Sequence, residues 1–190
     1  MNKKTKIFTL LFSGILFAYI LFQSYQRDNL LKIFYFLFLS IISIYIFYNG
    51  IFEEIKTKKN RSLKSYPLTL IGIFLILLNT GITGYYEIKL NRPTLIKAKN
   101  HGVYADFKKN GCYIIKSGSW ASKKYFYGKY KIKDSIITID KLDSENMRIS
   151  NKLVIMHHNK SKLKLFQTHK KENEILVNQS FEIMEDNRKQ

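Results

Sequence analysis

Cysteine is almost absent from this sequence: Cys112 is the only one in 190 residues. An intrachain disulfide is therefore excluded, and no pair of cysteines marks a zinc site. Cys112 directly follows the turn signal Asn110-Gly111. This position favours a structural role over a nucleophilic one.

Side chains suited to catalysis are also scarce. His157 and His158 are neighbours in a predicted strand, where adjacent side chains point to opposite faces, so they are poor partners for one metal. The aspartates fall at predicted strand ends and turns, where Asp commonly bonds its own backbone. The sequence thus predicts a protein that is not an enzyme, with no catalytic residues, no metal and no cofactor.

Acidic residues are few: 14 Asp and Glu stand against 32 Lys and Arg, giving a net charge of +18. A basic surface attracts anionic lipid headgroups, small anions such as nucleotides, and acidic proteins. The alternative is a solvated face on a Lys-rich protein. Nucleic-acid binding is not expected, because the cations are spread along alternating strands and no known nucleic-acid module is present.

Three long uncharged apolar stretches occupy the first half of the chain. They predict membrane-spanning helices at about 7–26, 30–52 and 66–86, since about 20 residues of helix cross the hydrocarbon core. The first stretch also resembles a cleaved secretory signal, because Lys3, Lys4 and Lys6 precede it. A cleavage site needs small residues at both its minus-one and its minus-three position, and this pair is missing at Phe22–Tyr25. The sequence therefore favours an uncleaved helix. We expect a membrane region over 1–90 and a water-facing domain over 91–190.

The distribution of Lys and Arg predicts the orientation of the spans. The amino terminus and the second connection, with Lys56, Lys58, Lys59, Arg61 and Lys64, are rich in cations, and such segments stay in the cytoplasm. Three spans then place the amino terminus inside and the carboxy-terminal domain outside the cytoplasmic membrane. Lys89, Arg92, Lys97 and Lys99 after the third span argue in the opposite direction.

The third apolar stretch has a face of small and polar residues. Gly72, Asn79, Thr80 and Thr83 recur at three- and four-residue steps and so share one side of a helix. Such a face lets helices approach closely, within this bundle or between copies of the chain. The alternative is a polar position in a pore or sensing path, with Asn79 as the central residue.

The water-facing domain is predicted to be β throughout. Strands are expected at 103–107, 112–116, 125–133, 136–140, 152–157, 163–167, 175–178 and 181–184, with the turns Asn110-Gly111 and Asp134-Ser135 forming hairpins. In one strand Lys129, Lys131 and Lys133 alternate with Gly128, Tyr130 and Ile132, which separates cations from core residues. Seven or eight short strands indicate a small antiparallel β-barrel or sandwich, and we favour the barrel.

One connection combines the only tryptophan with cations. A ring that stacks on a planar ligand beside several ammonium groups would suit an anionic molecule, whereas the alternative is a tryptophan that plugs the barrel end. The predicted ligand-binding residues are Trp120, Lys123, Lys124, Tyr125 and Lys129.

These segments also carry a resemblance. Gly118-Ser119-Trp120-Ala121-Ser122, Gly128–Ile132 and Asp134–Ile137 resemble lipocalin-like repeats of small bacterial membrane proteins without an assigned function. The order of membrane helices and then a minimal β-barrel is also similar to the membrane effectors of bacterial cyclic-nucleotide antiphage systems. That similarity implies a cytoplasmic barrel that binds a nucleotide messenger and helices that then disrupt the membrane. The effectors are described with two spans, whereas three are predicted here.

Three functional hypotheses follow. The first is a non-enzymatic binding or sensing protein of the bacterial cytoplasmic membrane, whose basic domain recognises a small anionic ligand or a protein partner. The second is a nucleotide-gated membrane effector. The third is an immunity protein that binds a toxin, for which a basic surface would suit an acidic partner.

Overall fold

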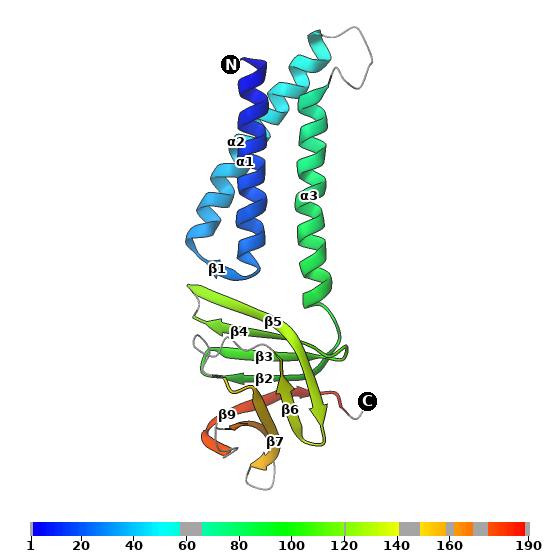
Figure 1. The fold of residues 1–190 in the computed structure, drawn as a ribbon. Helices are drawn as coiled ribbons and strands as arrows, with labels where there is room; N and C mark the ends of the chain where they lie inside the picture. The colour runs from blue at the N-terminus through cyan, green and yellow to red at the C-terminus, as the bar shows by residue number, and fades with distance from the viewer. Residues whose placement is uncertain are drawn as a thin grey trace. The chain divides into compact units, whose positions relative to one another are not determined.

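The computed structural model describes residues 2–57, 66–119, 121–140, 149–158, 162–168 and 175–188. The chain divides into two compact units, Met1–Lys89 and Leu90–Gln190. The first is helical and the second is built of strands, and each is described by itself (Figure 1).

The first unit contains three long helices: α1 (Lys3–Ser24), α2 (Leu31–Thr57) and α3 (Pro67–Leu90). All three are long and apolar enough to cross a membrane, which confirms the predicted spans and suggests a multi-pass membrane protein. Helix α2 runs beyond the predicted end at 52, because Glu53–Thr57 continue the helix in good helix-forming residues. A short strand, β1 (Arg27–Asn29), lies between α1 and α2.

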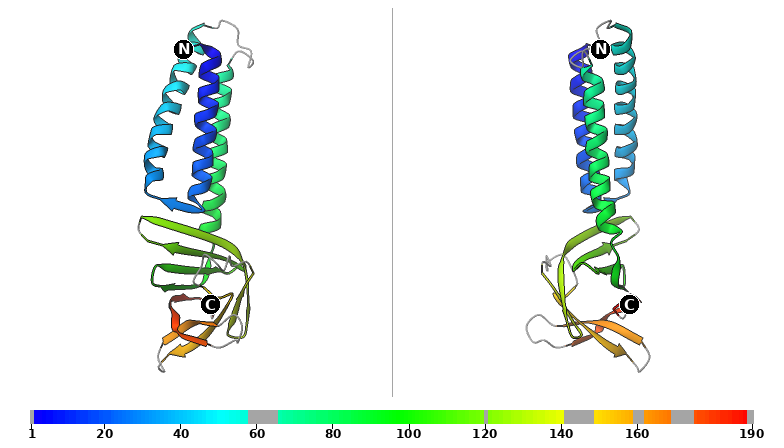
Figure 2. Two further views of the ribbon diagram at one scale, coloured as in Figure 1. Left: turned by 60° about the vertical axis from the view of Figure 1, so that its left-hand side comes forward. Right: turned by 90° about the vertical axis from the view of Figure 1, so that its right-hand side faces the viewer.

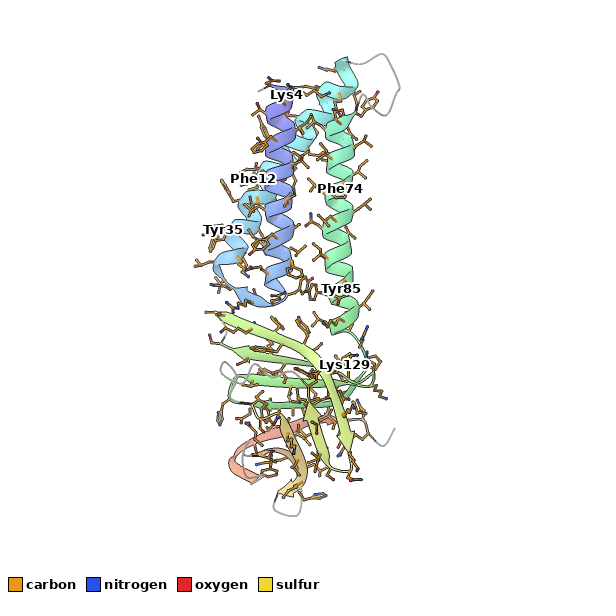
Figure 3. All side chains as sticks on the ribbon, viewed as in Figure 1. Lys4, Phe12, Tyr35, Phe74, Tyr85 and Lys129 are labelled. Atoms are coloured by element: carbon orange, nitrogen blue, oxygen red, sulfur yellow. The ribbon has the colours of Figure 1, made fainter. Side chains whose placement is uncertain are left out.

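The outer surfaces of these helices are apolar. Phe12, Tyr35 and Phe74, labelled in Figure 3, have exposed fractions of 62%, 60% and 58%. Exposed apolar area on this scale is rare on water-soluble monomers and is the surface that lipid requires. The helices therefore have an outer surface suited to hydrocarbon and keep only a narrow core of their own.

Glycines mark the places where the helices come together. A Cβ at Gly72 of α3 would lie 1.9 Å from the Phe47 ring of α2, and one at Gly14 of α1 would lie 2.4 Å from a Leu75 methyl of α3. Small residues allow such approach in membrane bundles, where dispersion contacts replace the hydrophobic effect. The bundle core is formed by Leu10, Ile46, Leu68 and Leu75.

A buried carboxylate caps the start of α3 at one end of the bundle. Glu54 of α2 is 3% exposed and accepts hydrogen bonds from the backbone N–H groups of Leu68 and Thr69 at 3.0 and 3.2 Å. These are orphan donors at the start of α3, which favours a negative charge. Lys3 lies 3.7 Å from the same carboxylate, and Lys6 pairs with Glu53. The ion pairs thus join α1 to α2, and the hydrogen bonds of Glu54 join α2 to α3.

The second unit is an eight-stranded antiparallel barrel. The strands are β2 (Thr94–Asn100), β3 (Val103–Lys108), β4 (Cys112–Gly118), β5 (Ser122–Lys133), β6 (Ile136–Ile139), β7 (Lys152–His158), β8 (Lys162–Thr168) and β9 (Ile175–Asp186).

Each strand of the barrel pairs with the next one along the chain, and β9 pairs back with β2 to close the ring. This is an up-and-down topology, seen from two sides in Figure 2. Strand β5 bends around a corner of the barrel: Cys112–Gly118 pair with its first half up to Lys129, and β6 pairs with Tyr130–Lys133. The predicted fold class, membrane helices followed by an antiparallel barrel, is confirmed.

Side chains from all eight strands fill the barrel. Phe107, Tyr113, Ile115, Leu153 and Leu165 are fully buried, and Tyr130 and Phe181 complete the packing. The predicted alternation in β5 is confirmed, since Tyr130 is buried while Lys129, Lys131 and Lys133 are exposed. The described interior is therefore a packed core of the kind small barrels have.

Two strands differ from the prediction. Strand β2 was not predicted; it forms a hairpin with β3 through His101 and Gly102, which both take positive φ angles as a tight turn requires. The separate strands expected at 175–178 and 181–184 are wrong, because β9 is continuous. Its pairing with β8 shifts register between Phe166 and Gln167, so a bulge accommodates the polar residues that suggested a break.

Candidate functional site

The outer face of the barrel carries a lysine held between two tyrosines. Tyr104 of β3, Lys116 of β4 and Tyr125 of β5 are cross-strand partners in one row. Lys116 Nζ lies 5.9 Å from the centre of the Tyr104 ring and 5.8 Å from that of Tyr125. Both distances fit cation–π attraction. The row thus holds the Lys116 ammonium group beside an exposed aromatic ring on paired strands. The exposed ring is Tyr104, which is 44% exposed.

Strand β5 extends this surface along the barrel. Phe126 packs on the core, so Lys123, Tyr125, Tyr127 and Lys129 point outward by strand alternation. The rings of Tyr125 and Tyr127 stack with centroids 6.5 Å apart and planes 10° apart. We call the outward residues Tyr104, Lys116, Lys123, Tyr125, Tyr127 and Lys129 the Tyr–Lys face.

The two strands that supply most of the Tyr–Lys face, β4 and β5, carry no acidic residue. Residues 112–133 contain six lysines and no Asp or Glu. None of these lysines belongs to an ion pair within the part of the chain that the structure describes. The lysines of β4 and β5 therefore have no carboxylate on their own two strands, and the neighbouring Asp106 of β3 is paired with Lys108.

The opposite wall of the barrel is different. In the ring order, β9 is four strands from β5 in either direction, and it carries Glu182, Glu185 and Asp186 without any cation. Glu182 faces Lys99 of β2 and Lys164 of β8, and Glu185 faces Lys97. Such cross-strand pairs of opposite sign neutralise one another. Lys97, Lys99 and Lys164 thus stand opposite carboxylates, in contrast to the lysines of β4 and β5.

The predicted ligand-binding residues are brought together in part. Lys123, Tyr125 and Lys129 share the Tyr–Lys face, whereas Lys124 has the other strand parity and is exposed near the strand's beginning. Trp120 lies outside the described residues. Tyr104 and Lys116 were missed, because their place beside Tyr125 depends on the register of three strands. The available signal was the alternation along this strand: Tyr113 and Ile115 are two residues apart and share one face, which places Lys116 on the other.

The predicted polar face of the third span lies along a crevice in the helical unit. Gly72, Asn79 and Thr80 line it, and Gly72 also receives the Phe47 ring. Thr83, one turn after Asn79, is half-buried and is not part of the lining.

The barrel's other polar clusters are structural. Lys108, 3% exposed, pairs with Asp106 at 2.7 Å, and its Nζ donates to the Leu90 carbonyl at 2.8 Å. Cys112 accepts a weak hydrogen bond from Arg92 at 3.8 Å. Among the described residues no group of three His, Cys, Asp or Glu side chains is placed to hold a metal.

Two buried tyrosines have perturbed acidity. Burial, and then the nearby Asp140, raises the pKa of Tyr113 to about 12. Burial, followed by Cys112 and Asp106, raises the pKa of Tyr130 to about 12. The Tyr130 hydroxyl donates to the Lys108 carbonyl at 2.7 Å. Both side chains therefore stay neutral in the core at physiological pH.

Comparisons with protein-family models, with curated proteins and with solved structures give no match.

Proposed function

We propose that this chain is a non-enzymatic, membrane-anchored binding protein whose barrel recognises an anionic ligand through the Tyr–Lys face. The observation that carries the proposal is the set of lysines on β4 and β5, without an acidic residue on either strand, around the Tyr104–Lys116–Tyr125 row. On the other side of the barrel, Lys97, Lys99 and Lys164 stand opposite carboxylates of β9. The lysines of the Tyr–Lys face supply ammonium groups for an external anion.

The geometry favours a ligand with both a planar and an anionic part. A planar group stacks on an exposed tyrosine ring, and the adjacent ammonium groups bind the anion. Small anions with a base or aromatic ring fit this description, as do acidic protein surfaces that present carboxylates to several lysines. Since Lys116 is held between two rings, less side-chain entropy is lost when the anion binds.

Binding of anionic probes to the full chain tests this proposal. The chain is reconstituted in zwitterionic nanodiscs, and three probes are titrated by calorimetry: a cyclic dinucleotide, inorganic pyrophosphate and a poly-glutamate peptide. Saturable binding of at least one probe, weakening as salt rises, is the expected result. Failure of all three to bind at low salt contradicts the proposal. Which of the three binds identifies the ligand class.

We further propose that the barrel lies outside the cytoplasmic membrane of a bacterium. The supporting observations are three helices long enough to span, the cations in the first turns of α1 and the cations that follow α2. Fusions of alkaline phosphatase and of green fluorescent protein to the carboxy terminus test the orientation. Phosphatase activity without fluorescence is expected, and fluorescence without phosphatase activity overturns the orientation while leaving anion binding open.

A second candidate function is a nucleotide-gated membrane effector of antiphage defence. The closed barrel after membrane helices favours it, since this is the order of elements in the effectors that the sequence resembles. It requires a cytoplasmic barrel, so the fusions separate it from the first proposal. Dye leakage from vesicles containing the chain, triggered by a cyclic dinucleotide and not by pyrophosphate, would support this function.

A further inference from the structure

The helical unit contains a crevice with a cavity volume of about 300 Å³ between α1, α2 and α3. Its walls include Phe17, Ser40, Phe47, Leu75, Asn79 and Thr80. Most of this lining is apolar, and the exposed Thr80 shows that the crevice reaches the surface of the helices.

Asn79 places an unmatched oxygen at this crevice. Its Nδ2 donates to the Leu75 carbonyl at 2.8 Å, which fixes the orientation of the amide. Its Oδ1 is buried and is the only buried side-chain oxygen or nitrogen without a partner in the part of the chain that the structure describes. Native proteins seldom leave such an acceptor unsatisfied, and the cost rises in hydrocarbon. A hydrogen-bond donor is therefore needed to satisfy Asn79 Oδ1.

The position of Asn79 in α3 and its polar neighbours restrict what kind of donor fits. Asn79 lies 12 residues after Pro67 and 11 before Leu90, close to the middle of α3. At 1.5 Å per residue it is about 17 Å from either helix end, where a charged ligand is strongly disfavoured. The two serine hydroxyls of the lining are already engaged: Ser43 bonds Ser13 at 2.9 Å, and Ser40 donates to the Leu37 carbonyl. A water needs two to four polar partners. A single neutral donor with an apolar body fits better.

We propose that this crevice binds a neutral, lipid-soluble alcohol or phenol. Its hydroxyl donates to Asn79 Oδ1, and its apolar body lies between Phe17, Phe47 and Leu75. The inference is independent of anion binding by the barrel, since it uses residues of the helical unit only. It assigns the chain a second ligand, which enters from the lipid phase.

Photolabelling of the full chain in phospholipid vesicles tests the site. The probe is azioctanol, a photoreactive aliphatic alcohol, and labelled residues are located by mass spectrometry. Labelling is expected to concentrate on the crevice lining and to be displaced by octanol but not by octane. Loss of one hydrogen bond in Asn79→Leu should lower labelling about five- to tenfold. Thr83→Val, a loss of one hydroxyl outside the lining, should leave it unchanged.

Two outcomes would overturn the inference. One is labelling spread over all exposed helix faces, with octane competing as well as octanol. The other is unchanged labelling in Asn79→Leu. The competition is measured on the wild-type chain, so the proposal is decided even where the variant fails to fold.

Discussion

Tyr113 of β4 and Gly128 of β5 are cross-strand partners, and the tyrosine side chain fills the space that a side chain at 128 would need. A Cβ at Gly128 would lie 2.6 Å from the Tyr113 hydroxyl oxygen and 2.6 Å from Asp140 Oδ1. The same Asp140 oxygen accepts the Lys129 N–H at 2.9 Å. Gly128 thus stands just before the point where β5 changes partner from β4 to β6. Glycine at such a corner lets a strand bend while an aromatic ring covers it.

Gly128→Ala should destabilise the barrel by about 1–3 kcal/mol, the usual cost of overpacking a filled core. Tyr113 is fully buried, so the added methyl group would have to displace a core side chain. Amide hydrogen exchange of barrel peptides, followed by mass spectrometry, measures the local free energy of opening. Lys131→Ala, an exposed position on the same strand, is the matched control and should change protection little. Equal protection in the two variants would show that the corner tolerates a side chain.

A second prediction concerns the contact between α2 and α3. Gly72→Ala should lower the midpoint of thermal aggregation in detergent, because the new methyl would overlap the Phe47 ring. Gly81→Ala on the same helix is the control, since no atom lies within 4 Å of a Cβ there. Adding Phe47→Ala to Gly72→Ala should recover part of the loss. A Gly72→Ala chain as stable as the Gly81→Ala chain would rule out this packing.

A third prediction concerns the buried cap at the start of α3. Glu54→Ala should cost about 1–2 kcal/mol, because it removes the acceptor of two helix N–H groups and a charge that favours the helix start. Faster hydrogen exchange at Leu68 and Thr69 reports the loss directly. Glu53→Ala removes a 60% exposed side chain and should cost less stability than Glu54→Ala. Equal exchange in both variants would contradict a capping role.

A fourth prediction follows from Tyr113 and Tyr130, whose pKa values are both raised to about 12. The folded barrel keeps these phenols protonated between pH 10 and pH 12, where the unfolded chain loses the protons. Stability is therefore complete below about pH 10 and falls as pH rises towards 12. Tyrosinate absorbance should show two late-ionising groups. Tyr130→Phe should make the alkaline loss of stability shallower, and an unchanged slope would contradict the assignment.

Much of the barrel was predictable from the sequence because lysine alternates with apolar residues along its strands. Lys129–Lys133 and Ile136–Ile139 show which face each side chain takes, and turn residues separate the strands. The pairing of β2 with β9 was not predictable in this way, since Ala98 and Ile183 are far apart in the sequence and local patterns carry no information about closure. The continuity of β9 depends on a bulge opposite β8, which is likewise a tertiary feature.

The candidate sites were predictable to different extents. Lys123, Tyr125 and Lys129 could be placed together because they alternate along one strand. The Tyr104–Lys116–Tyr125 row could not, since a shift of one residue in either register would turn Lys116 to the barrel interior. The face shared by Gly72, Asn79 and Thr80 followed from helical spacing. The orphaned Asn79 oxygen emerged only when the three helices were packed.

The central claim is that anions bind through the Tyr–Lys face, and affinity measurements on two matched triple variants test it most directly. The first replaces Lys116, Lys123 and Lys129 with glutamine, and the second replaces Lys97, Lys99 and Lys164, which face carboxylates across the strands. Both lose three charges from the barrel surface. At low salt, the first set should weaken binding of the tightest anionic probe by tenfold or more, and the second by less than threefold. Equal losses of affinity in the two variants would show that binding depends only on net charge. That result would contradict a site on β4 and β5.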